Sequence, residues 1–390
     1  MRKMNRHRLA ILTNMISPPR IPMFSGLAEH FDLMVLHGGI ESNRDSWNDQ
    51  DRNIPNAKVV KAWGWQFRIV RREKGQIFDL LYTHITPGYL WHLLRFHPDA
   101  IVTSEMGART LVALAYGTLF RKPVWVWWGG TCHTERNRGP VRAWLRRLIS
   151  RLAQHWISYG ETSTEYLLTL GIHRERILQI QNAVDESAFL SPGAPLFPLT
   201  VRPVVLHVGQ LIARKGIENL LKAAAALQSQ GHQFSLLLVG NGREKATLEK
   251  LAEHLGLQNV FFRQSLPANK MPAVYRSGDI LVFPTLEDVW GLVANEAVLS
   301  GLTVLCSKYA GCAQELFPPE TIFDPQNSEE FVAELRDALS GRLPKPNPAR
   351  LLTTRQIVDT IIGDIESSLD QRTQTPAHHR HAGNLNAAKY

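Results

Sequence analysis

The stretch that decides the fold is DILVFPTLEDVWGLVANEAVLSG, residues 279–301. Its apolar, β-branched run ends near Pro284, and helical periodicity begins around Val289, with Asp288 placed as an N-cap would be. Gly291 lacks a Cβ, so a ligand can approach the backbone amides of residues 289–293 closely. A strand that turns directly into a helix is the unit of an α/β sheet, and its helix start binds anions such as phosphate. We therefore expect an α/β fold with a phosphate site at this turn.

The same strand-and-helix rhythm occurs in both halves of the chain. In the first half, RLAILT, DLMVLHG, AIVTS and PVWVWW alternate with helical stretches, and in the second half PVVLHVG, FSLLLVGNG, VFFRQ, DILVFPT and TVLCS do the same. Between them lies the proline-rich SPGAPLFPLTVRP, which we take as a linker. We predict two Rossmann-like parallel-sheet domains that face each other across a cleft. Their predicted bounds are 1–190 for the first domain, 191–203 for the linker, 204–372 for the second domain and 373–390 for a disordered tail.

Composition narrows the class of protein. The 390 residues have a formal charge of +9 and a pI near 9.6, which favours an anionic partner without choosing between nucleic acid, acidic lipid and a phosphorylated substrate. Three cysteines without metal-ligand spacing fit a reducing compartment. The N-terminal apolar stretch is cut short by Thr13 and Asn14, and no apolar run approaches the roughly 18 residues of a membrane span. We expect a cytoplasmic protein.

Two further turns carry residues suited to a nucleotide ligand. HVGQLIARKG places Gly209 and Lys215 after a strand, where an ammonium group can contact a diphosphate, although a solvated surface turn is the ordinary alternative. LLLVGNG has two glycines between a strand and a helix, but it lacks the last glycine of a dinucleotide fingerprint. Glu296 lies about one turn into the helix that follows Gly291, where its carboxylate can accept hydrogen bonds from sugar hydroxyls. Each signal is weak alone, and the order of the motifs is more specific.

Taken together, the motifs resemble the family 4 retaining glycosyltransferases of the GT-B fold. The resemblance covers most of residues 178–325 and includes ILQIQNAVDESAF, HVGQLIARKG, LLLVGNG and EDVWGLVANEA, followed by GLTVLCSKYAG. In the first half, TNMISPPRIPMFSGLAEHF and PVWVWWGGTCHTERNRGPVRAWLRRL resemble acceptor-domain segments more loosely. The resemblance implies an enzyme that transfers a sugar from a UDP- or GDP-sugar to a glycan or lipid-linked saccharide in cell-surface polysaccharide biosynthesis. It also implies no cofactor and no metal, because protein cations and helix N-termini stabilise the departing diphosphate.

The resemblance also implies roles for individual residues. Lys215 would contact the diphosphate, and Glu296 would bind the ribose hydroxyls. Ser265 stands where the base edge is read through the main chain, and His133 is the first-domain candidate for contacting the transferred sugar, with an ordinary loop histidine as an equal alternative. The remaining candidates for binding the donor are in the two turns: Gly209, Gln210, Gly291, Leu292 and Val293.

Departures from the family pattern concern charges at the site. Gln210 stands where the family has an arginine, so one diphosphate cation is missing, and the sequence leaves open whether neighbouring Arg214 reaches the site. SPPRIP replaces a glycine pair in the first loop. The first acid of the two-acid motif lies eight residues before Glu296, which gives Asp288, whereas a shifted loop would bring in Glu287. We favour Asp288 as the residue that orients the donor sugar and leave Glu287 open.

A basic, amphipathic helix is expected over RNRGPVRAWLRRLISRLAQHW. Its apolar stripe and its arginines either pack on the domain's own sheet and face water, or rest on anionic membrane lipid through residues 138–156. We expect a peripheral position on the inner face of the membrane and no nucleic-acid partner, because the tryptophans lie mostly in apolar runs. The alternatives are a phosphorylase or epimerase of the same fold, or a catalytically weak nucleotide- or nucleic-acid-binding module. Asp49 and Asp51 form an Asp-x-Asp sequence that a solvated loop explains, as a solvated tail explains His378, His379 and His381.

Overall fold

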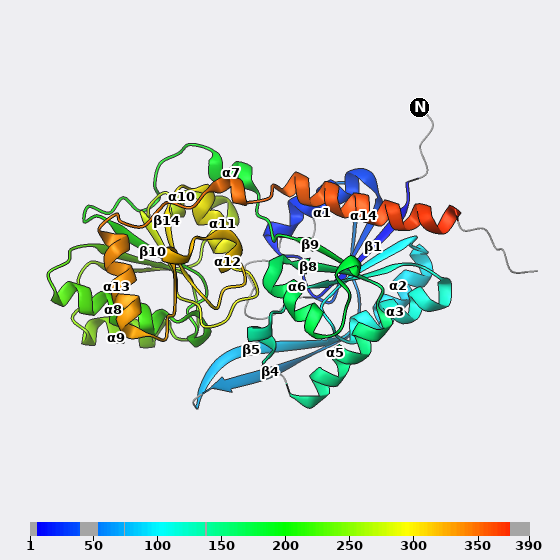
Figure 1. The fold of residues 1–390 in the computed structure, drawn as a ribbon, viewed down its shortest axis with the longest axis horizontal. Coiled ribbons are helices and arrows are strands. Elements are labelled where there is room, and N and C mark those ends of the chain that lie inside the picture. Colours follow the sequence, from blue (N-terminus) through cyan, green and yellow to red (C-terminus); the bar gives the residue numbers. More distant parts are fainter. Residues whose placement is uncertain (1–5, 40–53, 74, 137–138, 375–390) are drawn as a thin grey trace, which may run out of the picture.

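Two α/β domains lie side by side in the computed structural model, which describes residues 6–39, 54–73, 75–136 and 139–374 (Figure 1). The first contains a seven-stranded parallel sheet in the order β3-β2-β1-β6-β7-β8-β9. These strands are apolar and buried because helices cover both faces of the sheet. Their bounds are β1 Arg8–Thr13, β2 Asp32–His37, β3 Lys58–Lys61, β6 Ala100–Ser104, β7 Val124–Trp128, β8 His155–Tyr159 and β9 Ile177–Ile180.

The helices of this domain divide between the two faces of its sheet. One face packs against α1 through Phe24 and Leu27, and the other packs against α2 and α3 through residues such as Leu93 and Tyr116. All four side chains are fully or almost fully buried. The helix bounds are α1 Ile21–His30, α2 Gly88–Phe96, α3 Ala108–Phe120, α4 Cys132–Glu135, α5 Pro140–Leu152 and α6 Gly160–Thr169. The next helix, α7 Glu186–Leu190, lies against the second domain, where Phe189 contacts Tyr275 (Figure 1).

The second domain contains a six-stranded parallel sheet in the order β12-β11-β10-β13-β14-β15. Its strands are β10 Val204–Val208, β11 Ser235–Val239, β12 Val260–Arg263, β13 Ile280–Phe283, β14 Thr303–Ser307 and β15 Ile322–Phe323. Its helices are α8 Ile217–Ser229, α9 Lys245–His254, α10 Met271–Tyr275, α11 Leu292–Leu299, α12 Ala313–Leu316 and α13 Ser328–Leu339. Two Rossmann-like parallel sheets are therefore present, as the sequence predicts.

Strand order reverses next to β10 in the second domain. The chain passes from β10 to β11 and β12 on one side and then returns to β13 on the other side of β10. Loops that leave the carboxyl ends of β10 and β13 therefore diverge from a crevice, which is where ligands of open α/β sheets bind. These two loops contain Lys215 and Asp288.

An antiparallel hairpin, β4 Trp65–Glu73 and β5 Gln76–Ile85, projects from the first domain and was not expected from the sequence. It runs along the lower edge of the molecule in Figure 1, toward the second domain. Arg243 of the second domain donates a hydrogen bond to the carbonyl of Ile77 near the tip of the hairpin. The hairpin thus bridges the two domains.

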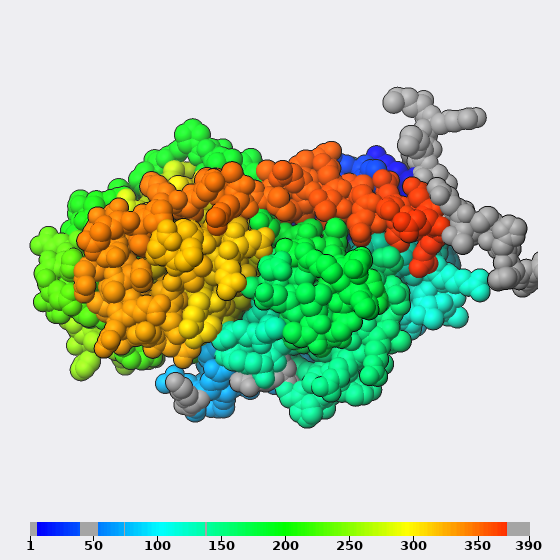
Figure 2. All heavy atoms as spheres, in the orientation of Figure 1, coloured from blue at the N-terminus to red at the C-terminus, as the bar shows by residue number. Residues whose placement is uncertain are grey.

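The C-terminal helix α14, Thr354–Gln374, corrects the predicted domain bounds. The predicted bounds include these residues in the second domain, but α14 crosses back and lies along α1 of the first domain (Figures 1 and 2). Gly26 allows the helices to approach, because a Cβ there would lie 3.0 Å from Val358. Trp125 donates a hydrogen bond of 2.6 Å to Asp364. An amphipathic helix of this length buries its apolar face wherever a complementary face is available.

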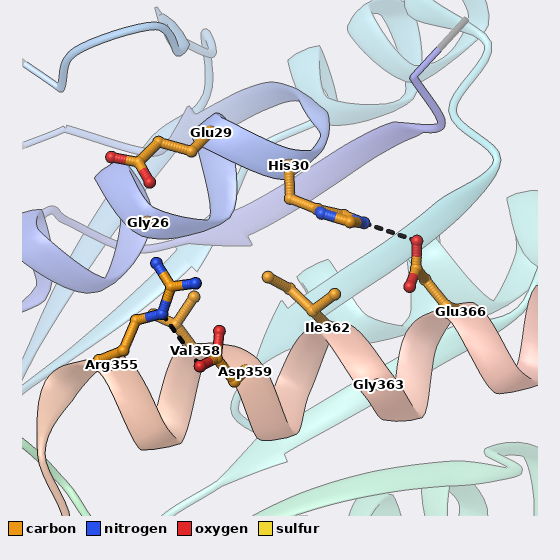
Figure 3. Close-up of a pocket in the computed structure, with 9 residues that line it drawn as sticks. All are labelled: Gly26, Glu29, His30, Arg355, Val358, Asp359, Ile362, Gly363 and Glu366. Carbon is orange, nitrogen blue, oxygen red and sulfur yellow. Dashed lines mark hydrogen bonds and ion pairs between the residues drawn. The ribbon is translucent and has the colours of Figure 1, made fainter. Parts of the chain in front are cut away.

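A groove of about 420 Å³ lies between α1 and α14 (Figure 3). Four of its polar side chains form two pairs: His30 lies 2.5 Å from Glu366, and Arg355 lies 2.9 Å from Asp359. It is formed by the packing of two helices on the edge of the molecule opposite to the hairpin (Figure 1).

Residues 191–203 contain no helix or strand, and the amide of Leu196 is bonded to the carbonyl of Ala273 in the second domain. Asp49, Asp51 and the three tail histidines lie outside the described residues, as does the predicted tail from residue 375 onward. Within the described part of the chain, no helix combines the length and the apolarity that a membrane span requires.

Candidate functional site

The turn after β13 is shaped by Gly291 rather than by the expected Asp288 cap. Helix α11 begins at Leu292, and its N-cap is Gly291 with φ +106°, a conformation that side chains rarely adopt. A Cβ at Gly291 would also lie 2.3 Å from the ring of Phe283. Asp288 instead accepts a hydrogen bond of 3.3 Å from the amide of Trp290. The prediction of Asp288 as N-cap is therefore wrong, because the glycine turn delays the helix by several residues.

The first amides of α11 remain available to a ligand. The backbone N–H groups of Leu292 and Val293 have no acceptor among the described residues, whereas Ala294 donates to the carbonyl of Gly291. Helix α11 is mostly apolar and has no acidic side chain in its first turn to neutralise the partial positive charge there. The amides predicted to hold phosphate thus lie at the start of a helix, next to the point where the strand order reverses.

Lys215 and Asp288 meet at the centre of the site. Lys215 ends a 3-10 turn, Ala213–Lys215, after β10, and its Nζ lies 2.5 Å from Asp288 Oδ2. Burial lowers the pKa of Lys215, and Asp288 opposes this effect. Burial alone would raise the pKa of Asp288, but the charges of Lys215 and Arg214 and the hydrogen bond from Lys215 lower it. Asp288 is therefore ionised at neutral pH, and an anionic ligand has to compete with it for Lys215.

Arg214 lies beside this pair, in the turn that follows Gln210, which stands where the family has an arginine. Its Nη1 is 3.9 Å from Asp288, and it donates a hydrogen bond of 2.7 Å to the carbonyl of Glu287. Its Nε forms an ion pair of 2.9 Å with Asp79 of the hairpin. Arg214 therefore brings a second cation to the site that Gln210, in the adjoining turn, cannot supply.

Glu287 is occupied by cations of the first domain. Its carboxylate accepts two hydrogen bonds, of 2.7 and 2.8 Å, from Arg71 of the hairpin, and a third of 3.3 Å from Arg136. The Glu287 side chain is only 5% exposed. Because its oxygens hold the two domains together, Glu287 is less available to a sugar than Asp288. The two candidates for the first acid thus have different surroundings.

His133 extends from the first domain to the second. It lies on α4, a short helix after β7 that begins with a capping box at Thr131. Its Nε2 is 2.9 Å from the carbonyl oxygen of Leu286, and its ring stacks on Tyr309 with centroids 4.4 Å apart. Burial lowers the pKa of His133, which keeps the imidazole neutral. His133 therefore lies at the domain interface, next to the loop that carries the two acids.

Glu296 lies one turn into α11 and is bonded to Tyr275. The hydroxyl of Tyr275 donates to its carboxylate over 2.5 Å. Burial raises the pKa of Glu296 to about 7, with the hydrogen bond from Tyr275 acting in the opposite direction. Its carboxyl group therefore changes charge near neutral pH.

Ser265 is exposed and follows β12, two strands away from β10. Its hydroxyl accepts a hydrogen bond of 2.8 Å from Asn241, and its amide lies 3.4 Å from the Asn241 side-chain oxygen. Asn241 belongs to the VGNG turn after β11. The structure therefore joins Ser265 to the glycine turn, while Lys215, Asp288 and His133 gather around the loop after β13.

Arg71, Asp79 and Arg136 were not identified from the sequence. Arg71 and Asp79 oppose each other in the register of the hairpin, and each pairs with a residue of the second domain. The only local signal was the Lys-Gly turn at residues 74–75 between two β-prone runs, which is typical of a hairpin. The pairing of that hairpin with a loop more than 130 residues away has no signal in a single sequence.

The comparisons with known proteins agree with this geometry. The family model of glycosyl transferases group 1 matches residues 198–351, which include both loops of the site. Residues 198–351 form a group 1 glycosyltransferase domain. The sequence-based assignment to this family, and with it the class of enzyme, is confirmed. The chain is 26% identical over 320 residues to the sulfoquinovosyl transferase SQD2 of Arabidopsis thaliana, covering 75% of this chain and 58% of that protein.

Two further proteins extend the comparison. The lipopolysaccharide glucosyltransferase WaaG of Escherichia coli K12 is 31% identical over 142 residues, covering 35% of this chain and 37% of WaaG. The chain thus spans less than two thirds of the length of both curated relatives. Among solved structures, Anabaena HepE in complex with UDP and glucose superposes with a TM-score of 0.66 at 17% identity, over 95% of this chain and 99% of HepE. The predicted GT-B fold is confirmed.

Proposed function

We propose that the protein is a retaining glycosyltransferase that moves a sugar from a nucleotide sugar to a glycan or lipid-linked saccharide in cell-surface polysaccharide biosynthesis. The observation that carries the proposal is the gathering of Lys215, Arg214, Asp288 and the unbonded amides of α11 at the strand reversal. A nucleoside diphosphate requires such cations and N–H donors. The UDP complex of HepE and the names of the relatives support this class of donor and acceptor.

Each residue then has a chemical role. Lys215 and Arg214, with the amides of Leu292 and Val293, stabilise the negative charge that develops on the diphosphate as the glycosidic bond breaks. Lys215 releases Asp288 when the diphosphate binds, and the freed carboxylate accepts hydrogen bonds from the donor sugar. In this scheme no metal is needed, because two protein cations neutralise the leaving group.

The other contacts fix the two ends of the donor. Glu296 accepts hydrogen bonds from the ribose hydroxyls once Tyr275 yields its place, and the main chain at Ser265, with Gly209 and Gln210 in the neighbouring turn, borders the nucleoside. His133 approaches the transferred sugar from the first domain, where the neutral imidazole can exchange hydrogen bonds with hydroxyl groups. Retention of anomeric configuration follows from the family resemblance.

A screen of nucleotide sugars by thermal stabilisation tests the donor. A donor at one hundred times its dissociation constant should add about 2.7 kcal/mol to the free energy of unfolding, whereas unrelated nucleotides should add little. Nuclear magnetic resonance of the transfer product then gives its anomeric configuration, and an inverted product would contradict the proposed mechanism. Formation of a sugar 1-phosphate that requires inorganic phosphate would instead indicate a phosphorylase.

We further propose a peripheral position on the inner face of the cytoplasmic membrane, supported by α5. The helix presents Val141, Trp144 and Leu152 to solvent, so part of its apolar surface faces outward. Two residues of the range 138–156 are not available to lipid: Arg146 is buried, where it pairs with Glu135, and Trp156 is buried in β8. A test of the role of charge in α5 therefore uses its two exposed arginines, Arg147 and Arg151. Replacing Arg147 and Arg151 by Ser should weaken co-sedimentation with anionic vesicles, and unchanged sedimentation would leave α5 a structural helix.

A further inference from the structure

The β4–β5 hairpin exposes large apolar side chains. Residues 65–70 of β4 are all exposed, with Trp65 at 59%, Phe67 at 51% and Ile69 at 46%. The hairpin forms a separate two-stranded sheet with no third strand among the described residues. Side chains of this size are costly to leave in water, and a contiguous patch of them marks an interaction surface.

The apolar side chains are contiguous. Trp65, Phe67 and Ile69 point to one face because side chains alternate along a strand, and Trp65 is paired in register with the exposed Ile85. Trp63 contacts Trp65 edge-on, with ring centroids 6.4 Å apart.

The patch continues from the hairpin onto α2. The Trp63 backbone lies against Gly88 at the start of α2, where a Cβ would come within 2.7 Å of it. Helix α2 exposes Trp91 to 52%. We call this surface, formed by Trp63, Trp65, Phe67, Ile69, Ile85 and Trp91, the hairpin platform.

The charges around the hairpin platform have one sign. Residues 58–72 and 80–98 contain no aspartate or glutamate. The exposed cations in these ranges are Lys58, Lys61, Arg68, Arg72 and Arg95, of which Arg68 and Arg72 lie on the face of β4 opposite to Trp65, Phe67 and Ile69. Arg95 lies 4.9 Å from the ring of Trp91, so that a cation and an aromatic ring are presented together. An aromatic surface with a basic border is complementary to a surface that is apolar inside and anionic at its boundary.

We propose that the hairpin platform docks on an anionic lipid bilayer. Tryptophan prefers the boundary between headgroups and acyl chains, and arginine and lysine reach phosphates from there. A second copy of the chain fits less well, because the same cations would face one another across the interface. Nucleic acid fits less well, because Ile69 and Ile85 offer no ring for a base to stack on.

The position of the hairpin gives the docking a consequence for the site. Beyond Ile69 the same strand carries Arg71, which is bound to Glu287, and the opposing Asp79 is bound to Arg214. The hairpin platform is therefore joined through a few residues to the loops of the glycosyltransferase site, and Figure 2 shows the hairpin, in blue, at the lower edge beneath both domains. Docking there would bring a membrane-embedded acceptor to the site. This consequence rests on the proposed function, whereas the docking itself does not.

Co-sedimentation of the full chain with lipid vesicles tests the docking. One set of vesicles contains phosphatidylcholine alone, and the other contains about 30% phosphatidylglycerol, which gives the surface a negative charge. The double variant Trp65→Ser, Phe67→Ser should lower the affinity for the anionic vesicles by about tenfold or more. Replacing Arg95, which lies on the ring of the platform residue Trp91, by Ser should lower it roughly fivefold, from about 1 kcal/mol for one basic residue. The control is Leu190→Ser, which removes a side chain that is 62% exposed on α7, at the opposite edge of the molecule in Figure 1.

The outcomes separate the possible occupants of the platform. Unchanged vesicle affinity in both the Trp65→Ser, Phe67→Ser variant and the Arg95→Ser variant, or an equal loss in Leu190→Ser, would overturn the proposal. Wild-type dimers that dissociate in Trp65→Ser, Phe67→Ser would identify a second copy as the occupant and also overturn it. Stabilisation by a nucleotide sugar, measured in the same variants without vesicles, should remain at the wild-type level. Loss of vesicle binding with intact donor binding therefore tests the docking separately from the proposed function.

Discussion

Replacing Glu296 by glutamine should change how stability depends on pH. Burial raises the pKa of Glu296 to about 7, whereas a glutamate in an unfolded chain titrates near 4.3. Between these values the folded state holds a proton that the unfolded state has released, so the free energy of unfolding falls as the pH rises. Because the folded pKa is raised, the penalty is absent well below pH 4 and complete above pH 7. Glutamine cannot ionise, and its side-chain oxygen can still accept the hydrogen bond from Tyr275.

The magnitude follows from the shift. A difference of roughly 2.5 pKa units corresponds to about 3 kcal/mol above pH 7, of which about 1 kcal/mol is already present at pH 5. The stability advantage of Glu296→Gln over wild type should therefore grow by about 2 kcal/mol between pH 5 and pH 8. Urea unfolding of both proteins at the two pH values measures this growth, and the difference between the proteins cancels the titration of all other groups. An advantage that stays constant over this range would refute the raised pKa.

The same variant tests the proposed ribose contact. An ionised carboxylate accepts hydrogen bonds about twice as strongly as a neutral group, so wild-type affinity for the nucleoside diphosphate should rise as the pH passes 7. Glu296→Gln should bind more weakly at pH 8 and should lose this pH dependence. Isothermal titration at pH 6 and pH 8 measures both effects. Wild-type affinity in the variant would remove Glu296 from the ribose site, even if the stability prediction holds.

The remaining predictions concern the charges around the loop after β13. Lys215→Ala should lower turnover by about a hundredfold or more, as loss of an oxyanion donor does, and near-normal turnover in a folded variant would exclude Lys215 from the site. Asp288→Asn should cut turnover with little loss of diphosphate affinity, whereas Glu287→Gln should chiefly lower the free energy of unfolding, by about 3 kcal/mol, because it breaks a buried pair. Normal turnover in Asp288→Asn beside an inactive, stable Glu287→Gln would reverse this assignment. If Asp79 positions Arg214, Asp79→Asn should raise the donor KM several-fold more than it lowers kcat. In a protein that already carries Arg214→Gln, the same substitution should then have little further effect, and full additivity of the two effects would argue against that coupling.

Much of the second domain could be predicted from short-range signals. The run DILVFPT, the glycines at 209 and 291, and the spacing of Lys215, Asp288 and Glu296 each depend on residues close together in the chain. Apolar alternation and glycine turns act over distances of a few residues, so the sequence by itself determines the strands, the turns and the ends of strands at which polar residues stand. That was enough for the family and the fold. These short-range signals did not identify the N-cap of α11, which is Gly291 and not Asp288, because the start of α11 depends on the ring of Phe283 beneath Gly291.

Tertiary structure alone decided how the two domains meet. The pairs Arg71–Glu287 and Asp79–Arg214 join residues that are more than 130 positions apart, and α14 returns to the first domain although its amphipathic pattern would suit either one. In α5 the periodicity predicts a helix, yet only its packing buries Arg146 and exposes Trp144. Ion pairs and burial depend on which surfaces come together, and a single sequence records the chemistry of each surface but not its partner. The sequence thus supplied the residues of the site, and the fold determined that Glu287 faces the first domain while Asp288 faces Lys215.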